Sequence, residues 1–377
     1  MALSPFAQTA GEPRSLEFRV VDPGAVPDWD HRLLAHPEAT IFHTAAWAEV
    51  LKQAYGFSAQ YLVQECRGEP VGLLPLMETQ GLLGKRRGIS LPFTDSCPML
   101  LPSGETPAEF SRAGDTLPTP SPTASTALVD QATRLGRTRH WRSIEFRPGP
   151  QPGVDGAASV RFLSHEVSLA ASDVAQRELC LPTTRRTLRQ AQSSPLCSTV
   201  GTDRSLMQAY YQLHCQTRRR QGAPPQPYGF FLALQRHLLA RNLGFVVLAT
   251  QAGRPVAGAV FLRFGRRAVY KFGASDTASL AFRPNQLVMW TGLRHAAGLG
   301  CTSLDFGRTS TDNLGLRQFK MGWGAAESHL AYHCYDLQTG HRVFLGDRTQ
   351  GWQSRLFRRL PVWAGRLAGT LLYRFAA

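Results

Sequence analysis

Charged residues are scarce in this sequence of 377 residues, and lysine is nearly absent. Charged side chains make up 18% of the chain, against ~25% in an average soluble domain. Only four of the 42 basic residues are lysine, yet the formal net charge is +15. A genome that favours arginine codons would explain most of this bias. Guanidinium groups also suit paired contacts to phosphate and carboxylate, so the excess favours an anionic partner: RNA, a nucleotide-linked substrate or a membrane surface.

Paired cysteines and long apolar runs are also missing. The seven cysteines are scattered, odd in number and show no CxxC spacing. This pattern argues against a metal site and a disulfide framework, and it favours a reducing compartment. Residues 1–17 contain no apolar core of signal-peptide length, and no run of about 18 apolar residues could span a bilayer. The sequence therefore predicts a cytoplasmic protein without a metal site.

Two halves of the chain show the same order of predicted elements. Residues 60–76 (QYLVQECRGEPVGLLPL) and 244–262 (GFVVLATQAGRPVAGAVFL) both read as a strand, a short polar turn with glycine and a second strand. In each half a further strand, a helix and another strand follow, with the helices beginning near Ser125 and at Pro284. A repeat of well over a hundred residues indicates duplicated domains.

This repeat predicts two tandem domains of the α/β (α+β) class and a tail. The first domain covers residues 1–180 and includes a Pro/Ser/Thr-rich segment at about 102–126, which is predicted to be a disordered surface loop. The second domain covers residues 181–345. In the tail, residues 346–377, leucine and tryptophan recur at three- and four-residue spacing among arginines, and Pro361 divides two predicted short helices. Such a basic amphipathic tail either lies on anionic lipid or docks on the second domain.

The stretch LDFGRTSTDNLGLRQFKMGWGA, residues 304–325, is the strongest candidate for a ligand site. A short strand ends at Asp305, a polar turn follows from Gly307, and a predicted helix carries Lys320. In open α/β sheets, ligands bind outside the carboxyl ends of the strands. An acid at a strand end, a polar turn and a lysine behind the turn therefore predict one wall of a cleft.

This stretch resembles the FemAB-like (Fem-type) acyltransferases, which are tandem members of the GNAT fold. The shared pattern is DFG, a polar turn, GL, FK, two residues and G, and its residues here are Asp305, Phe306, Gly307, Gly315, Leu316, Phe319, Lys320, Trp323 and Gly324. YKFGAS (270–275) and RPNQLVMW (283–290) also fit the family pattern. The resemblance implies two GNAT-like domains, each a mixed sheet flanked by helices.

The resemblance also implies roles for individual residues. Lys320 and Asp305 would be catalytic, and the substrate-binding residues would be Phe319, Arg308, Tyr270, Asn285 and Trp47. Simpler roles are open for several of them. Asp305 would cap the following turn, Lys320 would form an ion pair, and Trp47 would belong to a hydrophobic core.

Acyl transfer requires an amine, an activated ester and donors that stabilise the oxyanion. In the GNAT fold, a coenzyme A thioester is held by a glycine-rich loop at a helix N-terminus. The corresponding stretch here, ASLAFRPNQ (278–286), contains no glycine. The resemblance therefore favours an aminoacyl-tRNA as donor over acyl-CoA, with no bound cofactor.

One departure from the family concerns the acceptor. In Fem proteins that act on peptidoglycan precursors, a lysine lies four residues after the tryptophan that corresponds to Trp47. Here that residue is Leu51, and Lys52 lies about 100° further around a helix. This disfavours a nucleotide-linked peptidoglycan substrate, whereas FTDSCPML (93–100) resembles a branch associated with exopolysaccharide and envelope systems.

The resemblance implies an N-acyltransferase that acts on an amine of a cell-envelope, peptidoglycan or exopolysaccharide-related precursor. An acetyl-CoA-dependent N-acetyltransferase of a small amine or amino sugar is one alternative. A non-catalytic scaffold protein of envelope assembly is another. The expected partners are an anionic donor, an amine acceptor and, through the tail, the inner face of the membrane.

Overall fold

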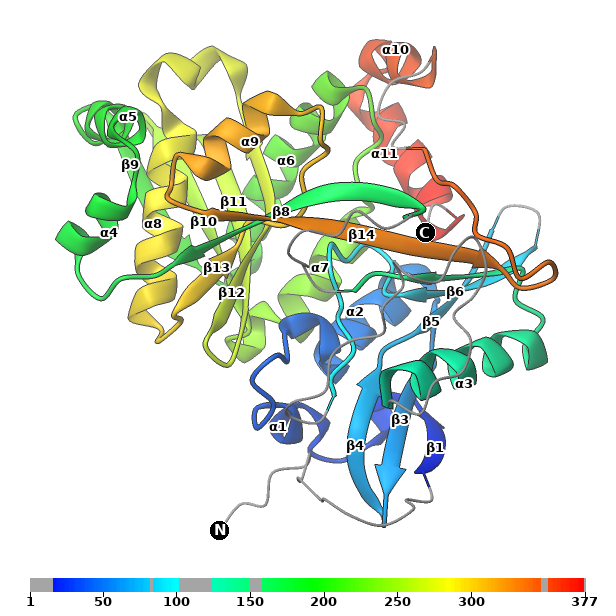
Figure 1. Ribbon diagram of the computed structural model, residues 1–377. Coiled ribbons are helices and arrows are strands. Elements are labelled where there is room, and N and C mark those ends of the chain that lie inside the picture. The colour runs from blue at the N-terminus through cyan, green and yellow to red at the C-terminus, as the bar shows by residue number, and fades with distance from the viewer. Residues whose placement is uncertain (1–15, 82–83, 102–123, 149–157, 347–351, 376–377) are drawn as a thin grey trace. The chain divides into compact units, whose positions relative to one another are not determined.

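A computed structural model describes residues 16–81, 84–101, 124–148, 158–346 and 352–375 (Figure 1). These residues form two compact units. The first takes the described residues of Met1–Leu163, Ser328–Asp347 and Arg374–Ala377, and the second takes those of Ser164–Glu327 and Arg348–Tyr373. The segment predicted to be a loop at 102–126 lies outside the described residues, except for its last three residues, which begin a helix. The domain limits at 180 and 345 stay a prediction.

The first unit contains a three-stranded sheet, in the order β1-β3-β4, and part of a mixed sheet, in the order β2-β5-β6-β7-β14. Its strands are β1 (Leu16–Val21), β2 (Ser58–Ala59), β3 (Tyr61–Cys66), β4 (Glu69–Leu74), β5 (Met77–Gln80), β6 (Arg86–Ser90), β7 (Ser143–Phe146), the start of β8 (Val160–Ser168) and most of β14 (Ala326–Asp336). Its helices are η1 (Pro23–Ala25), α1 (Trp29–Leu33), η2 (Ile41–His43), α2 (Ala45–Tyr55) and α3 (Ala124–Thr138).

The second unit is built on a sheet in the order β13-β12-β11-β10-β9. Its strands are the later part of β8 (Val160–Ser168), β9 (Leu196–Gly201), β10 (Gly244–Gln251), β11 (Arg254–Phe264), β12 (Arg267–Ser275) and β13 (Ser303–Asp305). Its helices are α4 (Asp173–Leu179), α5 (Pro182–Gln192), α6 (Arg204–Gln221), α7 (Tyr228–His237), η3 (Leu239–Arg241), η4 (Thr277–Phe282), α8 (Pro284–Gly298), α9 (Leu314–Met321), α10 (Trp352–Arg359), α11 (Val362–Leu372) and the start of η5 (Tyr373–Phe375).

Helices α6 and α8 cover opposite faces of this sheet, because successive residues of a strand point to opposite sides. Gly258 of β11 faces Tyr210 of α6, whereas Phe261 of the same strand lies against Gly292 of α8. A side chain at Gly292 would overlap the Phe261 ring, so the glycine lets α8 pack closely on the sheet. The helix predicted to begin at Pro284 is therefore confirmed, and it supplies one wall of the core.

The predicted repeat is visible in the strand registers. Within the first unit, β6 pairs parallel with β7, with Arg87 opposite Ser143. Within the second, β12 pairs parallel with β13, with Arg267 opposite Ser303. A helix, α3 or α8, connects the two strands of each pair. The mixed α/β fold class is confirmed, and the registers make residues 143–147 equivalent to residues 303–307.

The C-terminal tail docks on α6 of the second unit. As predicted, it forms two helices that are separated at Pro361. The Tyr373 hydroxyl donates to the Pro224 carbonyl at 3.2 Å and accepts from the Arg218 guanidinium at 3.1 Å. Gly369 lies so close to the Pro225 carbonyl that an added Cβ would be 2.0 Å from it. Within the described residues, no helix is both long enough and apolar enough to cross a membrane.

Candidate functional site

Strands β12 and β13 separate where the candidate site begins. They pair only from Arg267 opposite Ser303 to Val269 opposite Asp305. Beyond this point β12 continues to Ser275, while the other strand ends and the chain turns at Gly307, where φ is +70°. A bulge leaves Lys271 without a counterpart on β11. Beyond Val269 the edge of β12 is no longer paired with β13, and bulges often lie beside active sites.

Asp305 and Lys320 both form hydrogen bonds with the backbone of the turn at Gly307. The Asp305 carboxylate accepts a hydrogen bond from the Gly307 N–H at 2.7 Å, so it has the capping role that the sequence left open. The Lys320 side chain is 2% exposed, and its ammonium donates to the carbonyls of Gly307 at 2.7 Å and Arg308 at 3.1 Å. The Arg308 side chain is exposed. Lys320 therefore places a buried positive charge directly beneath the backbone of the turn.

Helix α9 carries Lys320 to this place. Asn313 caps the helix, since its side chain accepts from the Leu316 N–H at 3.2 Å. One residue before Lys320, the Phe319 ring is half-buried and packs edge-on against Trp323, with 6.2 Å between ring centroids. Trp323 is fully buried in the core of the second unit, so Phe319 fixes the helix against that core.

A hydrogen-bonded pair beside the turn, formed by the buried His165 and the half-buried Glu327, was not predicted from the sequence. His165 of β8 lies 3.0 Å from the Glu327 carboxylate through its Nε2 atom. Arg317 of α9 binds both oxygens of Glu327, at 2.6 and 2.7 Å. The His165 carbonyl accepts from the Phe306 N–H at 2.9 Å, which ties the pair to the strand end. His165 and Glu327 are 162 residues apart, and no local pattern connects them.

The charges around this pair set its protonation. Burial lowers the pKa of His165, and the nearby Lys320 charge lowers it further, while Glu327 opposes both effects. The hydrogen bond from Arg317 lowers the pKa of Glu327. At neutral pH the pair is thus a neutral imidazole and a carboxylate. If the imidazole donates from Nε2 to Glu327, its Nδ1 atom accepts from the Thr309 hydroxyl, 3.4 Å away.

Tyr270 and Asn285 lie on the neighbouring elements of the same unit. The Tyr270 ring packs against Phe261 and Phe306, at 5.5 and 6.2 Å between centroids, and burial raises the pKa of its phenol to about 12. Its hydroxyl therefore remains protonated. Asn285, in the first turn of α8, donates to the Ser275 hydroxyl at 3.4 Å, which joins that helix to the end of β12.

Trp47 belongs to the first unit. It is fully buried and packs edge-on against Phe42, with 5.2 Å between ring centroids. Four residues later Leu51 is also fully buried, while Lys52 points outward and binds Asp22 at 2.8 Å and Glu49 at 3.0 Å. The hydrogen bond to Asp22 raises the pKa of Lys52. Lys52 thus binds two carboxylates of the first unit, and whether it replaces the lysine that is absent at Leu51 stays a prediction.

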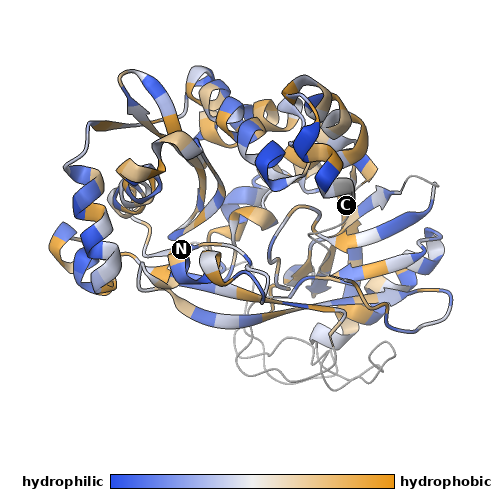
Figure 2. Ribbon diagram, turned by 90° about the horizontal axis from the view of Figure 1, so that it is seen from above, coloured by the Kyte–Doolittle hydropathy of each residue, from blue (hydrophilic) through white to orange (hydrophobic). Residues whose placement is uncertain are grey.

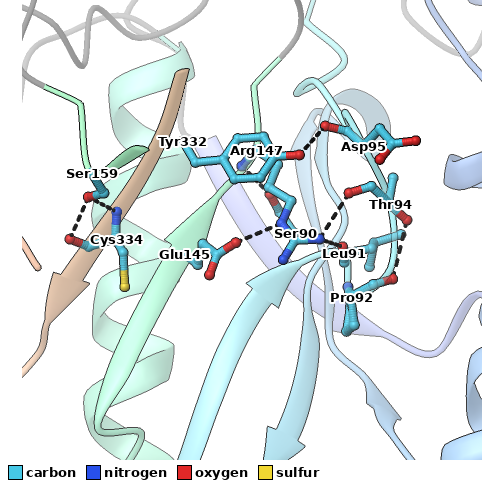
Figure 3. Close-up of polar contacts among 10 residues, drawn as sticks. All are labelled: Ser90, Leu91, Pro92, Thr94, Asp95, Glu145, Arg147, Ser159, Tyr332 and Cys334. Carbon is cyan, nitrogen blue, oxygen red and sulfur yellow. Dashed lines mark hydrogen bonds and ion pairs between the residues drawn. The ribbon is translucent and has the colours of Figure 1, made fainter. Parts of the chain in front are cut away.

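The first unit has an arginine at the strand end where the second has Gly307. Arg147 follows β7 as Gly307 follows β13, and its guanidinium binds the Glu145 carboxylate at 2.7 Å (Figure 3). It also donates to the carbonyls of Leu91 at 2.8 Å and Thr94 at 2.9 Å. Its side chain therefore fills the strand end of the first unit with internal contacts. The candidate site, where β12 and β13 separate, lies in the second unit.

Three of the predicted residues, Asp305, Arg308 and Lys320, meet at one turn. Asp305 and Arg308 belong to the turn, Lys320 binds its carbonyls, and Phe319 precedes Lys320 on α9. Tyr270 and Asn285 lie on β12 and α8. Trp47 is a core residue of the other unit. Within the described parts of the chain, no group of three or more His, Cys, Asp or Glu side chains could hold a metal ion.

Comparison with known proteins finds relatives for parts of this chain. Residues 181–321 match the acetyltransferase (GNAT) domain family. A 92-residue stretch is 32% identical to the lipid II:glycine glycyltransferase of Staphylococcus aureus; it covers 23% of this chain and 22% of that protein. The chain thus spans about a fifth of the length of the curated relatives that it matches.

Two solved structures share the fold over most of the chain. FemX superposes with a TM-score of 0.62 at 15% identity, over 84% of this chain and 95% of FemX. A tandem GNAT protein from the clavulanic acid biosynthesis pathway superposes with a TM-score of 0.51 at 12% identity, over 86% of this chain and 99% of that protein. At these identities the likeness concerns the fold alone.

Proposed function

We propose, from the premise that residues 181–321 are a GNAT acetyltransferase domain within a FemAB-like tandem fold, that this chain is an N-acyltransferase acting on an amine of a cell-envelope precursor. The observation that carries the proposal is the strand end of the second unit. There β12 and β13 diverge, and the buried Lys320 ammonium lies beneath the turn at Gly307.

This arrangement supports the chemistry of acyl transfer. The donor carbonyl would lie along the edge of β12 beyond Val269, where backbone N–H groups next to the bulge at Lys271 can bind its oxygen. As the acceptor amine attacks, negative charge develops on that oxygen. Lys320 contributes a fixed positive charge and orients the peptide groups at Gly307 and Arg308. Preorganised donors and charge of this kind supply much of the rate enhancement in acyl transfer.

The first turn of η4 disfavours a coenzyme A donor. The Asp276 carboxylate already accepts the Ala278 N–H at 3.0 Å, so an anion of the protein occupies the start of η4. The next helix, α8, begins at Pro284, which has no N–H to offer a pyrophosphate. Both features support an aminoacyl-tRNA as donor, and the arginine excess fits its phosphate backbone.

The acceptor class rests on the relatives. The matching protein of Staphylococcus aureus is named for glycyl transfer to lipid II, which makes an envelope precursor the acceptor that we propose here. The two carboxylates that bind Lys52 leave the first unit without the lysine expected for a nucleotide-linked precursor. We therefore favour a lipid-linked or saccharide-linked amine.

Donor choice can be tested with the full-length protein. It would be incubated with radiolabelled aminoacyl-tRNA prepared from a total tRNA pool or with radiolabelled acetyl-CoA, each with a panel of lipid-linked and amino-sugar acceptors. We expect label transfer from aminoacyl-tRNA, and tRNA binding that weakens steeply with salt. Transfer from acetyl-CoA alone would establish the alternative donor. Binding of neither donor, measured by calorimetry, would contradict the proposal.

A further inference from the structure

Helix α11 has two apolar faces, and among the described residues only one of them packs against the rest of the second unit. Gly365, Gly369 and Tyr373 lie on the face that meets the segment of Pro224 and Pro225. Trp363, Leu367 and Leu371 recur every four residues on the other side. Residues two positions apart on a helix are separated by about 200°, so the two rows lie on opposite faces.

The outer row is unusually exposed for such large apolar side chains. Trp363 is 70% exposed, Leu367 56% and Leu371 59%. Leu356 of α10 adds a further side chain that is 49% exposed. Contiguous exposed apolar side chains of this size mark an interaction surface more often than an ordinary solvent-facing helix. Blue and orange segments alternate along these helices in Figure 2, as expected for amphipathic elements.

The charged residues that flank this apolar row favour an anionic partner. Helices α10 and α11 contain Arg355, Arg358, Arg359 and Arg366 and no acidic residue. Beside them lies an open pocket of about 410 Å³, lined by Arg219 and Arg220 of α6 and by Arg358 and Val362 of the tail, with one acid, Asp276. Val362 directly precedes Trp363, so the basic pocket adjoins the apolar row.

We propose that the outer face of α10 and α11 is a docking surface for an anionic lipid bilayer. Trp363, Leu367 and Leu371 would enter the boundary between headgroups and acyl chains, where tryptophan is favoured. The flanking arginines would bind lipid phosphates, and the pocket at Arg219, Arg220 and Arg358 would hold a headgroup. Because the inner face of α11 stays docked on the second unit, the tail would attach the enzyme to the bilayer without unfolding from it.

The contacts on the inner face determine how this surface is tested. Deleting the tail would uncover α6, so the test uses substitutions on the outer face of the full-length protein. The test variant is Trp363→Glu with Leu367→Glu. The control is Val174→Glu, which places one acidic side chain, half the added charge of the test variant, at an apolar residue of α4 that is 67% exposed. A third variant, Arg355→Gln with Arg359→Gln, removes two exposed cations of α10.

Binding would be measured by co-sedimentation with vesicles of phosphatidylcholine, with and without 30 mol% phosphatidylglycerol (about a third of the lipid), in low and high salt. We expect the parent protein and Val174→Glu to bind the anionic vesicles equally. The apolar-row variant should bind at least tenfold more weakly, and the arginine variant should lose part of its salt dependence. All variants should keep the melting temperature of the parent protein.

Three results would overturn the proposal. The first is unchanged vesicle binding by the apolar-row variant, which would place any membrane contact elsewhere. The second is equal binding to neutral and anionic vesicles, which would remove the role of the arginines. The third is a parent protein that binds no vesicles and forms a dimer that the Trp363→Glu, Leu367→Glu variant abolishes, because the apolar row would then be covered by a second copy of the chain.

Discussion

Replacing Lys320 by methionine separates its electrostatic role from its place in the packing. Methionine retains the apolar stem of lysine but removes the ammonium and its hydrogen bonds to the carbonyls of Gly307 and Arg308. Hydrogen bonds to a charged group contribute about 1.5–3 kcal/mol each, and part of this is offset by the lower cost of burying methionine. We therefore expect the free energy of unfolding to fall by about 2–4 kcal/mol.

The expected loss of activity is larger than this instability explains. If the Lys320 charge stabilises the oxyanion, turnover should fall by about 10²–10³-fold, as for the loss of one oxyanion-hole donor. The assay is single-turnover acyl transfer at saturating donor, at least about 15 °C below the melting temperature of the variant, so that the unfolded fraction is negligible.

A matched control accounts for the lost stability. Leu234→Ala empties a fully buried site on α7 and costs about 2–5 kcal/mol through its cavity, without touching the turn at Gly307. We expect Leu234→Ala to keep nearly full turnover at the same distance below its melting temperature. If Lys320→Met is as active as Leu234→Ala under these conditions, Lys320 acts only in holding the turn, and its catalytic assignment is wrong.

Two further predictions concern stability. Gly324→Ala should lower the free energy of unfolding by at least about 2 kcal/mol, because Gly324 has φ of +81° and an added Cβ would lie 2.2 Å from the Leu179 carbonyl. The control Gly315→Ala has open space around it and should change the free energy of unfolding by less than about 1 kcal/mol. Equal melting temperatures of the two variants would contradict this prediction. Burial lowers the pKa of His214 and of His333 to about 3, so each residue stabilises the fold above pH ~6.5 and that stability is lost as pH falls towards 3. We expect a loss of about 2 kcal/mol for each histidine between pH 7.5 and 5, measured by thermal melts, and His214→Phe should reduce the slope; a melting temperature independent of pH would refute it.

Local signals in the sequence were enough to predict much of the fold. Pro284 at a first helical position and Pro361 between two amphipathic segments fixed helix limits that the structure confirms. The repeat was visible because each half keeps its own hairpin, crossover helix and parallel strand, and these depend on short-range pattern. The strand end at Asp305 followed from the same pattern.

The remainder of the site depends on contacts that no short window contains. His165 and Glu327 form a hydrogen bond although they are 162 residues apart in the sequence. The pair could not be predicted from the sequence, because neither residue lies in a recognisable motif. The contacts of Lys320 also depend on its burial in the fold. Its sequence position allowed an ion pair or an oxyanion donor, but only the packing of α9 shows that the ammonium lies beneath two carbonyls.

The arginine that fills the strand end of the first unit has a consequence for stoichiometry. Two related units would ordinarily offer two equivalent places for a donor. Arg147, bound to Glu145 and to the carbonyls of Leu91 and Thr94, fills the equivalent of the place beside Gly307 among the described residues of the first unit. A donor titration should therefore saturate at one equivalent per chain in a single step. The first unit would then be available to bind a different molecule.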